Sequence, residues 1–127
     1  MKIITTVFTS LTLVVSTAQA DEKYSHFPSL ESPNTPVALC NLLKFKEKLQ
    51  TIVSKKTLTP EDMVKVHELT YTLENAVIRL RTDLATIAVD LEKVHLASEH
   101  LDKETIKASG EKYLTATNLL LASPKCG

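Results

Sequence analysis

Apolar residues recur at alternating spacings of four and three over the second half of the chain, with no glycine or proline between Pro60 and Gly110. This pattern is typical of an amphipathic helix that presents one apolar stripe to a partner. We therefore predict one long helix from Pro60 to about His100. Its stripe, the seam, consists of Val66, Thr70, Leu73, Val77, Leu80, Leu84, Ile87, Leu91, Val94, Ser98 and Leu101.

The start of the long helix has the clearest boundary in the chain. Thr59 is a suitable N-cap, Pro60 suits the first helical position, and Glu61 and Asp62 place negative charge in the first turn. We expect the helix to begin at Pro60.

Two shorter helices flank the long one. Apolar residues three or four apart predict a first helix from Val37 to about Ser54. Asp102 is a plausible N-cap for a third helix from Lys103 to about Ala122, and Pro124 prevents its continuation.

The helix lengths predict an all-α fold of three helices with a long central helix. At about 1.5 Å per residue the central helix spans roughly 60 Å and the other two roughly 30 Å each. Each short helix would fold back along one half of the long one. Such a thin layer leaves apolar surface uncovered, and an antiparallel homodimer with a four-helix cross-section would cover it.

The alternative is a monomeric up-and-down four-helix bundle with a tight turn near Arg81 to Asp83. A turn normally carries Gly, Pro or Asn, and this stretch has none, which favours the long helix. Both arrangements bring Cys40 close to Cys126, so a disulfide between these residues does not distinguish the long-helix fold from the four-helix bundle.

The N-terminal residues predict export. Residues 1–20 combine Lys2, an apolar run and a small-residue ending, Ala18-Gln19-Ala20, as a signal peptide does. Residues 21–36 carry three prolines and no periodicity, so we predict an extended arm, followed by a helical domain over residues 37–127. We expect the mature chain in the periplasm, with no membrane insertion after signal removal.

Charge and cysteine content narrow the function classes. Removing Lys2 with the signal leaves 14 basic against 15 acidic residues, an interspersed balance that argues against nucleic-acid binding. Cys40 and Cys126 are the two cysteines, and an exported pair predicts a disulfide that would stabilise the fold by roughly 4 kcal/mol. Free thiols and bonds between chains are the alternatives.

The stretch His67 to Tyr71, HELTY, resembles a zinc-protease helix motif in which the second histidine is replaced by Tyr71. A catalytic zinc needs about three protein ligands, and His67 with Glu68 cannot supply them. If the seam faces inward, His67 lies at its flank and Glu68 on the outer face. We interpret the motif as a helix surface.

A second cluster contains His95 and Glu99, spaced i, i+4, which could hold a divalent metal ion or form a surface pair. His67 and His95 are nearly equidistant from Arg81, which makes a bis-histidine haem site conceivable. A metal or b-type haem carrier using His67, His95 and Glu99 is therefore an alternative function.

Sequence signatures of catalysis are missing. The chain has no G-x-S-x-G elbow, no glycine-rich phosphate loop and two glycines in all. We predict that the protein is not an enzyme and needs no cofactor.

Two segments, Leu58 to Val77 with T-P-E-D and H-E-L-T-Y-T-L-E-N-A, and Leu91 to Leu114 with V-H-L-A-S-E, carry a family resemblance. With His26-Phe27 they resemble an uncharacterised family of small exported proteins of Gram-negative bacteria. The resemblance implies a periplasmic, all-helical protein and implies no chemistry. The chain departs from the family at Ser29 to Pro36 and in its cysteine pair.

The expected function is that of a periplasmic helical interaction or structural protein, with an unknown protein partner or a second copy. If the family motif marks a binding surface, that surface lies on the long helix. Its candidate residues are His67, Glu68, Tyr71, Glu74 and Asn75.

Overall fold

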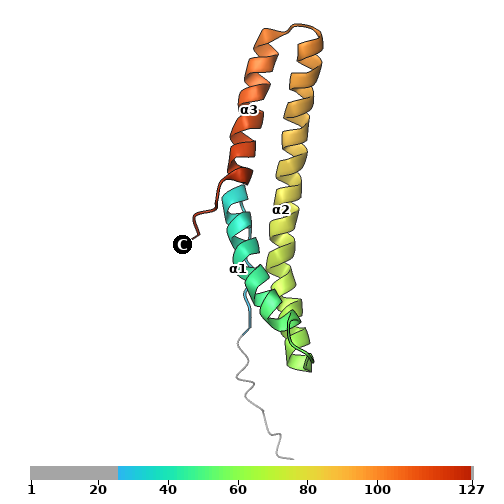
Figure 1. Cartoon of the computed structure of the whole chain (residues 1–127), viewed down its shortest axis with the longest axis vertical. Helices are drawn as coiled ribbons and strands as arrows, with labels where there is room; N and C mark the ends of the chain where they lie inside the picture. Colours follow the sequence, from blue (N-terminus) through green and yellow to red (C-terminus); the bar gives the residue numbers. More distant parts are fainter. Residues whose placement is uncertain (1–25, 127) are drawn as a thin grey trace, which may run out of the picture.

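The computed structural model describes residues 26–126, which form three helices: α1 Thr35–Val53, α2 Pro60–Glu99 and α3 Lys103–Leu121 (Figure 1). No strand occurs within residues 26–126. The predicted signal peptide, residues 1–20, and the first five residues of the predicted arm lie outside the described residues. The prediction of an all-α fold with a long central helix is confirmed.

The long helix α2 contacts both of the other helices along its length. α1 lies along its N-terminal half and α3 along its C-terminal half, nearly end to end on the same side of α2 (Figure 1). α2 is helical throughout Arg81 to Asp83, so these residues do not form the turn that a four-helix bundle would require there. The protein is therefore a layer two helices thick in one direction and one helix thick in the other.

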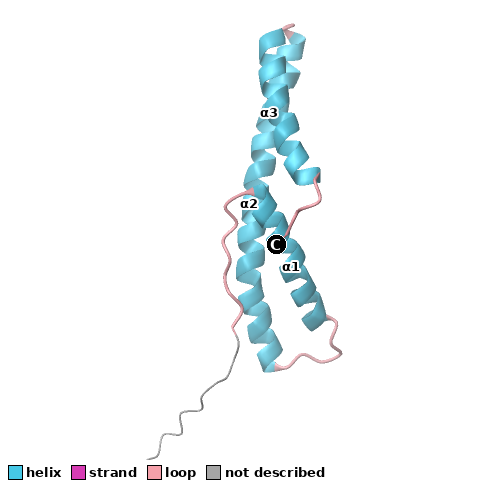
Figure 2. Ribbon diagram, turned by 90° about the vertical axis from the view of Figure 1, so that its left-hand side faces the viewer, coloured by secondary structure: helices cyan, strands magenta, loops and turns pink. Residues whose placement is uncertain are grey.

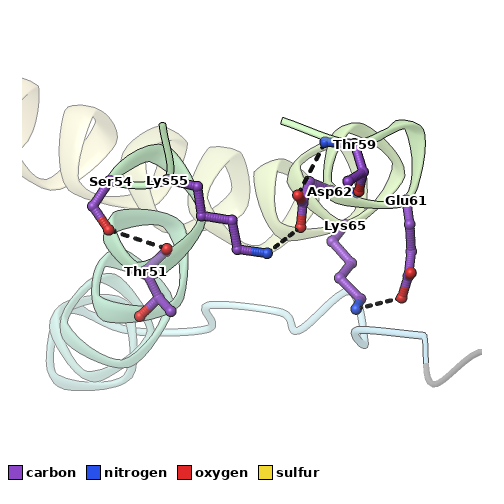
Figure 3. A network of polar contacts seen from close by, with 7 residues as sticks. All are labelled: Thr51, Ser54, Lys55, Thr59, Glu61, Asp62 and Lys65. Carbon is purple, nitrogen blue, oxygen red and sulfur yellow. Dashed lines mark hydrogen bonds and ion pairs between the residues drawn. The ribbon is translucent and has the colours of Figure 1, made fainter. Parts of the chain in front are cut away.

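The start of α2 is fixed by a reciprocal cap, as its sequence predicts. The Thr59 hydroxyl accepts from the Asp62 N–H at 3.2 Å, and the Asp62 carboxylate accepts from the Thr59 N–H at 3.1 Å. Lys55, in the loop after α1, reaches Asp62 at 2.6 Å (Figure 3). The hydrogen bonds from Lys55 and Thr59 lower the pKa of Asp62 to about 2. The cap thus also ties the α1–α2 loop to α2.

The start of α1 is fixed against the middle of α2. Asn34 caps α1, which begins at Thr35, two residues before the predicted boundary. The Thr35 hydroxyl donates to Asp83 at 2.8 Å, and Arg79 binds the same carboxylate through two nitrogens at 3.1 and 2.7 Å. Partial burial raises the pKa of Asp83, but these bonds outweigh it and the pKa is lowered overall.

The turn between α2 and α3 contains the one positive φ among the described non-glycine residues, 57° at Leu101. The Asp102 N–H donates to the Ala97 carbonyl at 3.0 Å, which closes the end of α2. The Asp102 side chain then accepts from the Thr105 N–H at 3.1 Å and caps α3, as predicted.

The main hydrophobic core lies in the α1 half of the molecule. Phe45, Ile52 and Leu69 are buried there. Partly buried residues packed around them are Phe27, Leu30, Leu49, Val66 and Leu73. Along the α3 half, the buried apolar residues are Ile87 and Ala97. The two halves therefore differ sharply in their burial of apolar side chains.

The predicted seam is partly wrong as a buried stripe. Ile87 is buried, but Val77, Leu84 and Leu91 are 55%, 54% and 47% exposed. The buried positions of the N-terminal half of α2 are instead Asp62, Leu69, Thr72 and Ala76. The reason is that α1 and α3 cover only one side of the seam, while the arm covers the opposite flank of α2 and buries Thr72.

The predicted disulfide is present. The sulfur atoms of Cys40 and Cys126 are 2.04 Å apart, and the bond joins α1 to the tail that follows α3. Figure 2 shows this tail reaching back from the end of α3 to α1. No helix in the described part of the chain is both long and apolar enough to cross a bilayer.

Candidate functional site

The arm, residues 26–34, lies along one side of the α1–α2 pair, at the left of Figure 2. Glu68 holds its beginning. One carboxylate oxygen accepts from the Phe27 N–H at 3.0 Å, and the other contacts the His26 ring nitrogen Nδ1. The Phe27 N–H and His26 together lower the pKa of Glu68, so the carboxylate is charged in the docked arm.

Thr72 and Asn75 hold the next part of the arm through its backbone. The buried Thr72 hydroxyl accepts from the Leu30 N–H at 2.9 Å and donates to the Pro28 carbonyl at 2.8 Å. The Asn75 amide donates to the Leu30 carbonyl at 3.1 Å. Glu68, Thr72 and Asn75 follow one another on one helix face, which therefore binds an extended segment by its main chain.

Side chains from α1 complete the arm's attachment. Asn41 donates to the Glu31 carbonyl at 3.2 Å and to the Ser32 hydroxyl at 3.0 Å. Lys48 places its ammonium 4.4 Å from the centre of the Phe27 ring, a cation–π contact. The arm is thus a third structural element of the α1 half.

The five predicted surface residues do not act together. Glu68 and Asn75 face the arm, so the prediction that Glu68 lies on the outer face is wrong: its side chain is 14% exposed. The Tyr71 hydroxyl is 2.9 Å from the His67 Nε2, with the rings edge to face. Glu74 remains exposed on the opposite flank of α2.

The candidate metal and haem residues are spread along α2. His95 Nε2 lies 3.4 Å from the Glu99 carboxylate, and both side chains are exposed. The described residues contain no group of three or more His, Cys, Asp or Glu side chains placed to hold a metal ion. His67 and His95 are 28 positions apart on one continuous helix, about 42 Å, so they do not meet within one chain.

A different surface appears on the side of the layer away from the arm. On α2, Val77, Leu84 and Leu91 lie on the flank opposite Glu68, Thr72 and Asn75, because seven residues are nearly two helical turns. On α3, Leu114 and Leu121 are 58% and 79% exposed. They are rotated around α3 from buried Ser109 in the same sense as Leu84 and Leu91 are rotated around α2 from buried Ile87. Because the two helices are antiparallel, these leucines lie on the same side of the layer. We call the surface formed by these five apolar residues the arm-free face.

Both helices contribute to the arm-free face at matching heights. α3 runs antiparallel to α2, and Gly110 of α3 lies opposite Val94, since a Cβ on Gly110 would be 4.0 Å from the Val94 Cγ2 atom. Counting from this contact puts Leu91 level with Tyr113 and Leu84 level with Leu120, so Leu114 and Leu121 each lie within one residue of these levels. Each of these two leucines of α2 therefore has an exposed leucine of α3 beside it. A shallow hollow lined by Thr70, Leu73, Glu74, Val77 and Ile78 continues the face along α2.

Reasoning from the sequence missed Thr72 and the arm-binding role of Glu68 and Asn75. A signal was available: in H-E-L-T-Y-T-L-E-N these polar residues are spaced four and three apart, beside the apolar seam. These three side chains offer the hydrogen-bond acceptors and donors that the main chain of a neighbouring extended segment needs.

Comparison with known proteins gives one match. The model of a family of unknown function, DUF6746, matches residues 1–122. No curated protein and no solved structure matches the chain. Because the family match covers all three helices and the arm, the chain belongs to the DUF6746 family of unknown function.

Proposed function

We propose that this protein is an exported, non-enzymatic interaction protein of the periplasm, which binds a protein partner through its arm-free face. The observation that carries the proposal is the exposure of Val77, Leu84, Leu91, Leu114 and Leu121 on one side of two adjacent helices. Contiguous apolar patches of this kind are uncommon on isolated soluble proteins and mark interaction sites.

The arrangement of the layer supports this surface over the opposite one. On the arm side, the α1 half is already covered by the arm, and the α3 half presents polar residues such as Thr86, Lys93 and Lys112. The arm-free side has no such cover, and its five defining residues are apolar, with Glu74 and Arg81 at its edge. A partner of complementary apolar shape would bury the exposed leucines at a favourable free energy of about 25 cal/mol per Å².

Export is supported by the predicted signal peptide, residues 1–20, and by the disulfide between Cys40 and Cys126. Stable disulfides belong to oxidising compartments such as the periplasm. Cell fractionation with mass spectrometry of the native protein tests this part. A mature chain starting at Asp21 in the periplasmic fraction is expected, and an uncleaved cytoplasmic chain would refute it.

The test of the binding surface is a capture experiment on the mature protein. The face variant, Leu84→Glu with Leu91→Glu, places two charges on the arm-free face. The matched control is the edge variant, Val89→Glu with Leu96→Glu. It places the same charges on the outer edge of α2, where the native residues are 55% and 47% exposed. Partners from periplasmic extract, including untagged copies of the same protein, are quantified by mass spectrometry.

The proposal predicts a partner that wild type and the edge variant capture equally and that the face variant loses at least tenfold. Equal capture by both variants, or the same proteins on an empty resin, would contradict it. Circular dichroism establishes that both variants keep their helices.

A further inference from the structure

We infer that the partner of the arm-free face is a second copy of the same chain, packed antiparallel so that α2 lies against α2 of its partner. This inference rests on the proposed function and names the occupant of the same surface. Three observations support it: the symmetry of the seam about the middle of α2, two charged residues placed beside it, and the area of the face.

The apolar positions of α2 are symmetric about one point. Val66 and Leu91, and likewise Leu73 and Leu84, are equidistant from the midpoint between residues 78 and 79. This midpoint is within one residue of the middle of α2, Pro60–Glu99. Two copies related by a twofold axis there would align Val66 with Leu91 and Leu73 with Leu84, over nearly the whole helix.

Two charged residues flank the axis with opposite signs. Glu74 and Arg81 lie on the same flank of α2, just outside the apolar stripe, and neither forms an ion pair within the described chain. In an antiparallel pair of helices this flank faces its own copy. Glu74 of each chain then lies beside Arg81 of the other, which gives two symmetric ion pairs that favour this orientation.

The same twofold axis places unlike halves together. α1 of one copy lies over α3 of the other, so the half with the larger core covers Leu114 and Leu121 of the half with little core. Every level of the dimer then has four helices in cross-section, the usual number for a stable bundle.

The face is large enough for a stable dimer. α2 is 40 residues and therefore about 60 Å long, and at a helix diameter of about 10 Å one side of it offers roughly 600 Å² per copy, to which the flanks of α1 and α3 add. A stable interface buries about 800 Å² per partner. The outer edge of α2, with Tyr71, Ile78 and Leu96, is also apolar but belongs to a single helix, so it offers less area.

The first experiment is light scattering of the purified mature protein over a range of concentrations. Wild type and the edge variant, Val89→Glu with Leu96→Glu, are expected at twice the mass of one chain. The face variant, Leu84→Glu with Leu91→Glu, is expected at half that mass with its helicity retained. A wild type that is monomeric at every concentration would overturn the inference.

The second experiment fixes the orientation by thiol crosslinking, with the native disulfide left closed. Val66→Cys and Leu91→Cys each lie 25 positions from their own copy in the dimer, about 38 Å, so neither variant should crosslink alone with a short reagent. A mixture of the two should give a crosslinked dimer, and Val77→Cys, beside the axis, should crosslink to itself. Self-crosslinking of Leu91→Cys would show a parallel dimer and overturn the inference.

The results separate this inference from the proposed function. A monomeric wild type whose face still captures another protein overturns the second copy as partner and leaves the binding surface intact. A dimer that the face variant does not dissociate overturns the second copy as the partner of this face, because the interface must then lie elsewhere. The proposed function itself fails only if the face variant and the edge variant capture the same partners.

Discussion

The two halves of α2 carry the same kind of apolar stripe but are covered to different extents. In the α1 half, three segments meet: α1, α2 and the arm, with Phe45, Ile52 and Leu69 buried between them. In the α3 half, two helices meet along Ile87, Ala97 and Ser109, and large apolar residues stay exposed on both helices.

The difference shows what a pair of helices requires. Two helices can cover only one side of each other, so a third segment is needed to enclose a core. The arm supplies it for the α1 half through backbone hydrogen bonds to Glu68, Thr72 and Asn75. Nothing in the described chain supplies it for the α3 half, which is why we assign that role to a partner.

Removing the disulfide that links the two halves should have the largest effect on the stability of the protein. Cys40→Ser with Cys126→Ser removes a bond that closes a loop of 86 residues, and the free energy of unfolding should fall by about 4 kcal/mol. Urea unfolding at one fixed protein concentration measures it, and wild type under reducing conditions should show the same loss. A loss below about 1 kcal/mol would mean that the tail does not hold the halves together.

A second test compares the loss of one buried hydroxyl in each half, Thr72 in the α1 half and Ser109 in the α3 half. Thr72→Val keeps the shape but leaves the Pro28 carbonyl and the Leu30 N–H without their partner, so it should cost about 2 kcal/mol. Ser109→Ala removes a buried hydroxyl that makes no hydrogen bond, so stability should change by less than about 0.5 kcal/mol. Equal losses in urea unfolding would refute the contrast between the halves.

Lowering the pH should have a smaller effect, which is the release of the arm from α2 without unfolding of the helices. The folded-state pKa of Glu68 is lowered from its ordinary 4.5, so the docked arm is favoured above that pH and loses this stabilisation as the pH falls through the lowered pKa. Amide resonances of Phe27 and Leu30 should report the release. In Glu68→Gln the side chain does not titrate, and the same resonances should not respond over this range.

The smallest effect concerns the packing of α3 on α2. Gly110 lies inside α3, and a Cβ there would be 4.0 Å from Val94, an ordinary contact. Gly110→Ala should therefore stabilise the protein by about 0.5 to 1 kcal/mol through helix propensity. A destabilised variant in thermal unfolding would show that the two helices approach each other more closely than the structure indicates.

Local signals explain what could be predicted from the sequence. The cap formed by Thr59 and Asp62 and the continuity of α2 through Arg81 follow from neighbouring residues alone. The pairing of Cys40 with Cys126 needed only the helix lengths and two cysteines.

The covered side of the seam could not be predicted. A heptad pattern says that Leu84 and Leu91 share a face, but not whether α1 and α3 lie over that face or beside it. The docking of the arm left only a faint signal, the spacing of Glu68, Thr72 and Asn75, because these side chains bind main-chain groups of the arm, which have no sequence signature of their own.

Hydrogen–deuterium exchange at low and high protein concentration tests the central claim, that the α3 half is completed by a second copy. Amides of α3, Lys103–Leu121, should exchange markedly more slowly at high concentration, whereas amides around Phe45 in α1 should be protected at both, because the α1 half has its own core. Exchange of α3 that does not depend on concentration would contradict the account.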